Sequence, residues 1–349
     1  MFLSLCLLSL VFSYLFTGKI LILAQKFNIV DDPTLNPDRK KQSQSVPLLG
    51  GLGFSLVAGS VSAGLILARD WNWLGLNYRL GQNIALDFNF WGVLAGGIVI
   101  LIAGFLDDRF NLNAKLMLLL VNLAIAISVF GGGLQIASLS YPFDQLLPNF
   151  ALLHYFLAYV WILLCISATK FLDGHDGLVG SIGVFALVTI AVVSLFPNVN
   201  QPLIFVLAAI WAAAILGFLP FNLPNARMYL GEIGSEMIGF VIGVLSIASG
   251  AKVATASSII GWFVLDLILV FGIRLYRGKS ILAGGREHWP FRLVDKGLGK
   301  WQVLFVTLVI IISTSILGLV LPTLYKPLVL ILQAMILILG YRWTSSSKK

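Results

Sequence analysis

Eleven mostly apolar stretches, each about as long as a membrane-crossing helix, follow one another along the 349 residues. A helix needs roughly 17–25 such residues to cross the hydrocarbon core. Lipid admits only helices or closed barrels, because every backbone polar group must be paired inside the protein. The stretches lie near 2–24, 46–68, 90–106, 114–131, 150–169, 177–196, 202–220, 235–251, 253–275, 302–321 and 327–343. We expect an all-α polytopic membrane protein with about 10–11 transmembrane helices, the last two stretches being the weakest.

Composition excludes a soluble globular protein of this length. Hydrophobic residues make up 59% of the chain and charged residues 11%, and the mean hydropathy is +0.96, which leaves too little polar surface. The first apolar stretch has no positive amino-terminal region, so we expect a retained helix. Cys6 and Cys165 both lie in apolar stretches, which argues against a disulfide or a zinc site. We expect one integral-membrane domain over residues 1–349.

Lysine and arginine are distributed unevenly between the two sides of this topology. If the first helix starts outside, 18 of the 23 basic residues fall in inner loops or at inner helix ends. The positive-inside rule then orients the chain in a cytoplasmic membrane. The net charge of +8 suits anionic lipids and anionic substrates, although topology alone explains it equally well. We expect no nucleic-acid partner.

The carboxylates concentrate on the same inner side. Asp107 with Asp108, Asp173 with Asp176, and Glu232 each follow or precede an apolar stretch. Acidic groups at a membrane are costly unless they face a cavity, a cation or a partner. We therefore expect a cytoplasmic-face cleft built from inner loops near 25–45, 107–113, 170–176, 221–234 and 276–300.

Each acidic position has a functional and a structural interpretation. Adjacent Asp107 and Asp108 repel, which suits a base or a metal ligand, whereas a helix cap would need only one of them. Asp173 and Asp176 are flanked by glycines, so they can approach a nucleobase, a ribose or a metal. Glu232 suits Mg²⁺ as an oxygen ligand.

Other inner-loop residues are less specific. Tyr229, close to Glu232, offers a stacking face. Lys40, ahead of a glycine pair, indicates a phosphate contact or simply a positive inner loop. Lys170 indicates a structural salt bridge or a pyrophosphate contact. For Glu236 and for Asp266, deep in an apolar stretch, we favour structural roles.

The loop after the ninth stretch is the most basic part of the chain. Arg286 and Arg292 flank His288 there. Arginine forks with an imidazole make a good diphosphate clamp, although a lone histidine is more often structural.

In this order and spacing, the loops resemble those of the polyprenyl-phosphate N-acetylhexosamine-1-phosphate transferases. The matching motifs are RK before PLLGG, LDDRF, FLDGHDGL, FN-x-P-x-AR-x-YLGE-x-GS and RxH-x-x-x-RL, over about residues 30 to 300. The resemblance implies transfer of a sugar-1-phosphate from a UDP-amino sugar to a polyprenyl phosphate such as undecaprenyl phosphate. UMP is released, Mg²⁺ is the expected cofactor with Mn²⁺ as a substitute, and a homodimer is left open.

The resemblance also assigns roles to individual residues. Asp107 and Asp108 match the paired aspartates, one of which is proposed to deprotonate the lipid phosphate, and Asp108 with Glu232 would hold the metal. His288 matches the first histidine of a catalytic loop. Positions expected to contact the uridine, sugar or phosphates are Lys40, Lys170, Asp173, Asp176, Asn222, Tyr229, Arg286 and Arg292.

Four positions depart from the family pattern. The family commonly has asparagine at Lys170, histidine at Gln42, aspartate at Glu232 and a further histidine at Pro290 or Phe291. Lys170 matters most, because a cation repels Mg²⁺ unless it pairs with Asp173 or contacts the diphosphate.

The departures leave other functional classes open. The leading alternative is a weakened or inactive relative that serves as a lipid- or nucleotide-binding scaffold. A secondary transporter would place charges at the membrane midplane and show repeat symmetry, neither of which the sequence predicts. The RxH loop is closer to the branch that uses UDP-N-acetylglucosamine than to the muramyl-pentapeptide branch.

Overall fold

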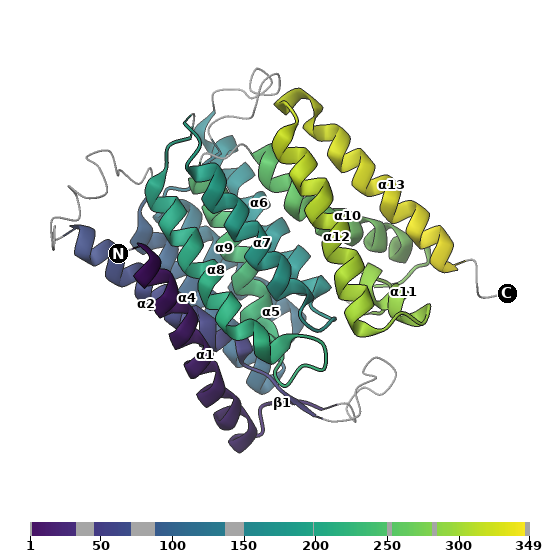
Figure 1. Ribbon diagram of the computed structural model, residues 1–349, viewed down its shortest axis with the longest axis horizontal. Helices are drawn as coiled ribbons and strands as arrows, with labels where there is room; N and C mark the ends of the chain where they lie inside the picture. Colours follow the sequence, from purple (N-terminus) through teal and green to yellow (C-terminus); the bar gives the residue numbers. More distant parts are fainter. Residues whose placement is uncertain are drawn as a thin grey trace.

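The computed structural model describes residues 2–32, 45–70, 88–136, 150–197, 199–249, 253–280 and 285–345. These residues form a bundle of long helices (Figure 1). The long helices are α1 (Phe2–Lys26), α2 (Gly50–Asp70), α4 (Phe90–Phe110), α5 (Ala114–Ala126), α6 (Ala151–Leu172), α7 (Leu178–Ser194), α8 (Pro202–Asn222), α9 (Gly231–Ala248), α10 (Val253–Tyr276), α12 (Lys300–Val320) and α13 (Lys326–Ser345).

Five short elements complete the described structure. The π-helical turn η3 (Ile127–Gly131) continues α5, α11 (Trp289–Asp295) lies between α10 and α12, and the 3-10 turn η5 (Thr323–Tyr325) precedes α13. Strands β1 (Val30–Asp31) and β2 (Val46–Pro47) pair antiparallel, with Val30 opposite Pro47.

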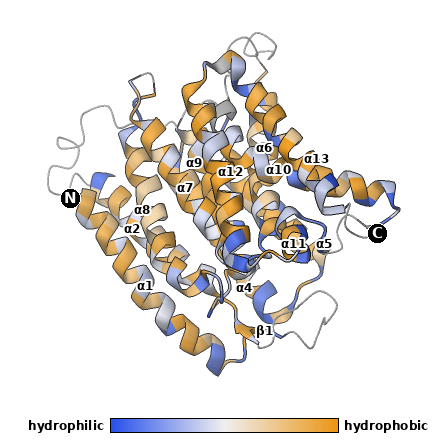
Figure 2. Ribbon diagram, turned by 45° about the vertical axis from the view of Figure 1, so that its right-hand side comes forward, coloured by the Kyte–Doolittle hydropathy of each residue, from blue (hydrophilic) through white to orange (hydrophobic). Residues whose placement is uncertain are grey.

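The predicted fold class is confirmed. Within the described residues, ten helices are long and apolar enough to cross a membrane. The remaining predicted stretch, near 177–196, forms α7, which is apolar but has 17 residues. The two weakest stretches form α12 and α13, so all eleven fold as helices. Figure 2 shows these helices as mainly hydrophobic, with hydrophilic residues around β1 and α11.

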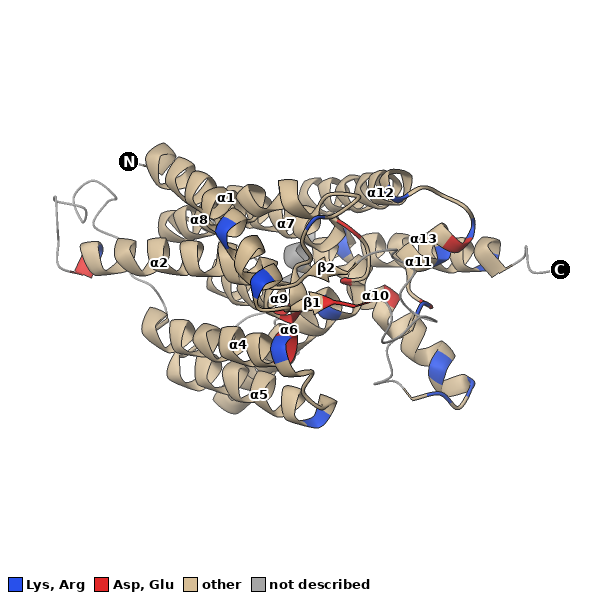
Figure 3. Ribbon diagram, turned by 90° about the horizontal axis from the view of Figure 1, so that it is seen from below, with Lys and Arg blue, Asp and Glu red and all other residues tan. Residues whose placement is uncertain are grey.

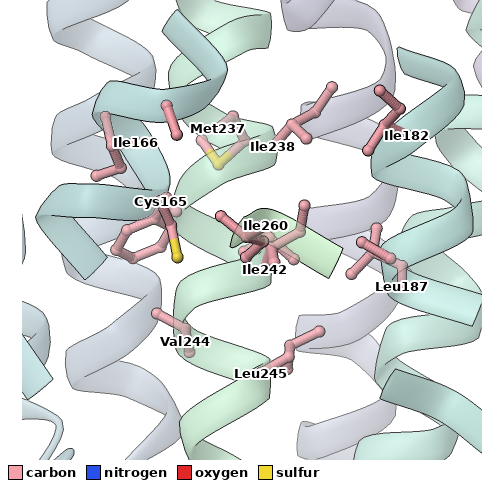
Figure 4. Packing of buried hydrophobic residues seen from close by; sticks show 14 of the residues in the cluster. Cys165, Ile166, Ile182, Leu187, Met237, Ile238, Ile242, Val244, Leu245 and Ile260 are labelled. Carbon is pink, nitrogen blue, oxygen red and sulfur yellow. The ribbon is translucent and has the colours of Figure 1, made fainter. Parts of the chain in front are cut away.

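Helix α9 lies at the centre of the bundle and contacts α2, α4, α6, α7, α8 and α10. The small residues of α9 allow the neighbouring helices to approach it closely. A Cβ atom on Gly51 would lie 2.1 Å from the Gly234 nitrogen, and one on Gly239 would lie 2.4 Å from Thr169 Oγ1. Close backbone approach of this kind is typical of membrane helices. Figure 4 shows Cys165 of α6 near Met237 and Ile242 of α9. Both cysteines are free.

Helices α10, α12 and α13 pack against one another, and α11 contacts α12 and α13 (Figure 1). A buried amide contributes to this packing, since Gln333 Nε2 donates to the Ser258 carbonyl at 2.8 Å and to Thr314 Oγ1 at 2.9 Å. Paired polar groups of this type connect helices where lipid offers no partner.

Successive helices reverse direction, which brings the ends of α4, α6, α8 and α10 to the same side as the starts of α7, α9 and α12. Figure 3 shows acidic and basic residues meeting around α4, α6, α9 and β1. The inner loops of the sequence therefore come together at one end of the bundle.

Candidate active site

The last turn of α4 contacts the first turn of α9 through Asp108. Its Oδ1 accepts a hydrogen bond from the Glu232 backbone N–H at 2.8 Å, as carboxylates at helix N-termini commonly do. Its Oδ2 is buried and has no hydrogen-bond partner among the described residues. Gly231 has φ of +70°, and a Cβ atom there would lie 2.3 Å from Asp108 Oδ2. Glycine therefore satisfies both the left-handed backbone and the close approach.

Lys170, on the last turn of α6, pairs with two glutamates of α9. Its Nζ lies 2.9 Å from Glu232 Oε2 and 2.8 Å from Glu236 Oε1. The Glu236 side chain is fully buried, so an unpaired charge there would be very costly. The salt bridges that Lys170 forms are with Glu232 and Glu236, so pairing with Asp173, one of the two alternatives left open, is not the arrangement in the structure. The structural role favoured for Glu236 takes the form of this ion pair.

Two further aspartates complete a group that we call the carboxylate cluster: Asp107, Asp108, Asp173, Glu232 and Glu236. Asp107 interacts electrostatically with Glu232 and Lys170. Asp173 directly follows α6, where burial, followed by the charges of Glu232 and Asp176, raises its pKa well above 3.8. Accumulated negative charge of this kind attracts a cation or a proton.

Asp176 joins three inner segments rather than facing the cluster alone. Its Oδ2 accepts from Lys300 Nζ at 2.7 Å and from the backbone N–H groups of Asn225 and Ala226 at 3.1 and 3.3 Å. Lys300 was missed at the sequence level, where it counted only as one more inner positive charge. No motif marks it, because its partner is 124 residues away.

Asn222 also has internal partners for both ends of its amide. It is buried, its Oδ1 accepts from the Gly177 N–H at 3.1 Å, and its Nδ2 donates to the Met228 carbonyl at 3.0 Å. These bonds fix the α6–α7 turn against the α8–α9 loop. A uridine contact from Asn222 stays a prediction.

Tyr229 connects the strand pair to the cluster. Its N–H donates to the Pro47 carbonyl at 2.9 Å, and its carbonyl accepts from the Gly50 N–H at 3.0 Å. Burial, followed by the charges of Asp176, Asp31 and Asp173, raises the pKa of its phenol. The ring is thus neutral at physiological pH and is suited to stacking.

His288 lies beside α10 and is almost fully buried. Its Nδ1 is 2.7 Å from Asp266 Oδ2, and its ring stacks on Phe171 at 6.2 Å. Asp266 Oδ1 also accepts from the Trp289 N–H at 3.0 Å and from the Tyr341 hydroxyl at 2.7 Å. Asp266 therefore connects α10, α11 and α13, which is the structural role predicted for it.

The two arginines of the predicted clamp have protein partners. Arg286 pairs with Asp295 at 2.9 Å and lies over the Phe291 ring at 4.9 Å. Arg292 Nε donates to the Glu287 carbonyl at 2.7 Å, and its guanidinium lies 4.0 Å from the Tyr341 ring centre. The contact between Arg292 and Tyr341 holds α11 against α13. Lys40 lies outside the described residues.

The carboxylate cluster offers oxygen donors, which are the ligands that Mg²⁺ prefers. No group of three histidine, cysteine or acidic residues arranged to hold a metal occurs in the described part of the chain. Mg²⁺, however, commonly uses one or two carboxylates and completes its shell with substrate phosphates and water. The unpartnered Asp108 Oδ2 beside Glu232 fits that mode.

The chain is similar to known glycosyltransferases. The model of glycosyl transferase family 4 matches residues 90–250, which include the whole carboxylate cluster. A Bacillus subtilis protein named "Probable undecaprenyl-phosphate N-acetylglucosaminyl 1-phosphate transferase" is 29% identical over 82% of this chain and 76% of its own length.

Two further relatives have names of the same kind. The Thermotoga maritima undecaprenyl-phosphate alpha-N-acetylglucosaminyl 1-phosphate transferase is 24% identical over 88% of this chain and 87% of its own length. The Mycolicibacterium smegmatis decaprenyl-phosphate N-acetylglucosaminephosphotransferase is 27% identical over 82% and 74%. With its polytopic helical fold and its converging acidic motifs, the chain is similar to the proteins of glycosyl transferase family 4.

Proposed function

We propose that this protein transfers an N-acetylhexosamine-1-phosphate, with N-acetylglucosamine-1-phosphate as the first choice, from a UDP-sugar to a polyprenyl phosphate. A phosphate oxygen of the lipid bonds to the sugar-bearing phosphorus, the bond from that phosphorus to the bridging oxygen breaks, and UMP leaves with that oxygen. The observation that carries the proposal is the carboxylate cluster at one end of the spans, with an unpartnered Asp108 oxygen. The relatives' names supply the amino sugar and the polyprenyl phosphate.

Asp107 is the better placed of the paired aspartates to act as the base. Asp108 is committed to the Glu232 N–H, whereas Asp107 is half-buried and interacts electrostatically with Lys170. A partly exposed carboxylate can reach the lipid phosphate and take its proton. Asp108 instead positions the start of α9.

Asp108 and Glu232 are the residues that would hold Mg²⁺. When bound, the ion would neutralise charge on the diphosphate, which is the main requirement of phosphoryl transfer. Lys170 adds a second positive charge at the same place. We infer that its ammonium contacts a diphosphate oxygen while staying paired with Glu236, which explains how the site accommodates a cation there.

A second candidate function rests on the same lysine. The ion pair between Lys170 and Glu232 occupies a carboxylate that a metal would use. A catalytically inactive scaffold that binds nucleotide or lipid would retain this pair permanently. It would bind UDP-sugar or polyprenyl phosphate without forming product.

The distribution of basic residues is the basis for the proposed orientation of the protein in the membrane. With the cluster end facing the cytoplasm of a bacterial inner membrane, the basic residues of the 277–300 region lie inside, as the positive-inside rule requires. UDP-sugars are cytoplasmic donors, so the two arguments agree.

The test follows both substrates in one reaction. Purified protein receives undecaprenyl phosphate, Mg²⁺ and UDP-N-acetylglucosamine labelled in the sugar-bearing phosphate, with other UDP-amino sugars in parallel. The proposal expects the label in lipid and unlabelled UMP in equal amounts. Bound donor with no labelled lipid favours the scaffold, and free sugar-phosphate without lipid product contradicts the transfer.

A further inference from the structure

The His288 ring is held through one nitrogen and is free at the other. The side chain is buried, and Nδ1 lies 2.7 Å from Asp266 Oδ2. Nε2 has no hydrogen-bond partner within the described residues. It is not one of the fully enclosed polar atoms that lack a partner there, so it borders accessible space. The ring therefore has one nitrogen fixed by the protein and one left for a ligand.

The His288 ring lies beside the end of α6 that leads into the carboxylate cluster. It stacks on Phe171, which precedes Asp173 by two residues. From the same segment, Phe291 packs on Gly174, where a Cβ atom would lie 2.2 Å from the Phe291 Cζ atom. The free nitrogen is therefore at the end of the bundle that holds the cluster.

The second oxygen of Asp266 has two donors of its own. Oδ1 accepts from the Trp289 N–H at 3.0 Å and from the Tyr341 hydroxyl at 2.7 Å. These donors belong to α11 and α13, and they fix which oxygen faces the imidazole. Because a carboxylate can only accept hydrogen bonds, the His288 nitrogen that faces Oδ2 carries a proton.

We propose that Asp266 is a positioning residue of the site: it keeps a proton on His288 Nδ1, so that Nε2 is the nitrogen that contacts the UDP-sugar. This inference rests on the proposed function. In the neutral ring Nε2 accepts a hydrogen bond from the substrate, and in the protonated ring it donates one to a phosphate oxygen. Tyr341 holds Asp266 in place, which makes the carboxy-terminal helix α13 part of the site, although the family model matches only residues 90–250.

Asp266→Asn should move the ring proton to the wrong nitrogen. The amide oxygen keeps the Trp289 and Tyr341 donors, because an amide nitrogen cannot accept them. The amide nitrogen then faces Nδ1 of His288, which must accept, and the neutral ring carries its proton on Nε2. The same exchange in a serine-protease triad lowers kcat by about 10⁴-fold. We expect kcat/KM for UDP-N-acetylglucosamine to fall by about 100-fold or more.

A double-variant cycle shows whether Asp266 acts through His288. In the His288→Gln background, Asp266→Asn should lower kcat/KM by no more than about twofold, because residues that act as a unit are not additive. Tyr341→Phe is a milder probe that removes one donor to Asp266. It should cost about fivefold in the wild-type background and nothing in His288→Gln. Losses that are the same in both backgrounds would overturn the proposal.

Gln333→Leu is the matched control for a role in packing alone. Gln333 is fully buried and bonds to Ser258 of α10 and Thr314 of α12, so it joins α13 to the helices around Asp266. It lies about 12 Å along α13 from Tyr341. Gln333→Leu should lower Tm and leave kcat/KM near wild type. An activity loss as large as that of Asp266→Asn would show that packing of these helices explains both variants.

A tautomer measurement separates this inference from the transferase reaction. The chain has three histidines, His154, His175 and His288, so ¹⁵N NMR of histidine-labelled protein is simple, and His288→Gln assigns the signal. We expect the proton on Nδ1 in wild type and on Nε2 in Asp266→Asn. We also expect UDP-N-acetylglucosamine to shift the wild-type Nε2 signal more than the Nδ1 signal.

These signals support the positioning role even if no variant forms product, so a failed transfer assay does not decide it. A wild-type ring with its only proton on Nε2 would overturn the proposal. An Nε2 signal that does not move in protein shown to bind the UDP-sugar would also overturn it.

Discussion

The Nζ atom of Lys170 lies 2.9 Å from Glu232 Oε2, so a lysine of α6 occupies the side of a glutamate that was predicted to bind metal. The same ammonium lies 2.8 Å from the buried Glu236. One cation thus neutralises part of the charge of two carboxylates. This pairing is the main difference between the site and the family pattern, which commonly has asparagine at the position of Lys170 and aspartate at that of Glu232.

Removing the lysine charge should destabilise the protein. Lys170→Met leaves Glu236 buried and unpaired, and we expect a loss of about 3 kcal/mol in the free energy of unfolding. The double variant Lys170→Met with Glu236→Gln should recover most of it. Chemical denaturation in detergent measures both.

Lys300→Met is the matched control for this prediction. Lys300 is about half exposed, and its partner Asp176 keeps two backbone donors. Its removal should cost no more than about 1 kcal/mol. Equal losses of unfolding free energy in Lys170→Met and Lys300→Met would show that burial of the Lys170–Glu236 pair adds nothing to its contribution to stability.

Gly231→Ala should impair both folding and turnover. Its backbone is left-handed, and the added Cβ atom would meet Asp108 Oδ2 at 2.3 Å. Gly278 has φ of +66° with open space around its Cβ position, so Gly278→Ala isolates the backbone cost of about 1 kcal/mol. We expect a larger stability loss for Gly231→Ala and a fall in kcat of about 100-fold, because displaced catalytic groups lose about that much. Equal effects in both variants would show that the contact with Asp108 is unimportant.

Asp107→Asn and Asp108→Asn should fail in different ways. If Asp107 is the base, its amide variant loses about 10²- to 10⁴-fold in kcat with an unchanged Mg²⁺ requirement. Asp108→Asn should raise the Mg²⁺ concentration needed for half-maximal rate. Magnesium titrations of both purified variants distinguish the roles, and a shifted Mg²⁺ requirement in Asp107→Asn alone would reverse the assignment.

Asp173 should make stability depend on pH. Burial and neighbouring carboxylates raise its pKa above 3.8 in the folded state, so the folded protein binds this proton more tightly than the unfolded chain. The contribution is fully present below pH 3.8 and is lost as pH rises through the folded pKa. The Tm of the Asp173→Asn variant minus the Tm of the wild type should therefore increase as pH rises from about 4 to 8. A Tm difference that is constant with pH would contradict the raised pKa.

Much of the fold was predictable because lipid imposes helices on apolar stretches of sufficient length. The stretches near 302–321 and 327–343 form α12 and α13 for that reason. The meeting of Asp108 and Glu232 also followed from topology, since alternate helices end on the same side. The 17-residue length of α7 did not follow, because hydropathy also assigns Gly177, Leu195 and Phe196 to the span, whereas these residues form the turns at the two ends of the helix.

Side-chain partners across distant segments were not predictable. Lys170 and Glu236 are 66 residues apart, and their pairing depends on the rotation of α6 against α9. The charge of Arg292 was visible in the sequence, but its bond to the Glu287 carbonyl depends on how α11 packs. Sequence spacing predicts neither the rotation of α6 against α9 nor the packing of α11.

The central claim is a metal-dependent transfer at a site that contains Lys170. The most direct measurement is UMP release by the purified protein from UDP-N-acetylglucosamine and undecaprenyl phosphate, with Mg²⁺, with EDTA, and with EDTA followed by excess Mg²⁺. The account predicts UMP release with Mg²⁺, none with EDTA, and recovery when the metal is restored. Equal UMP release in EDTA, or none under any condition from protein that binds both substrates, would contradict it.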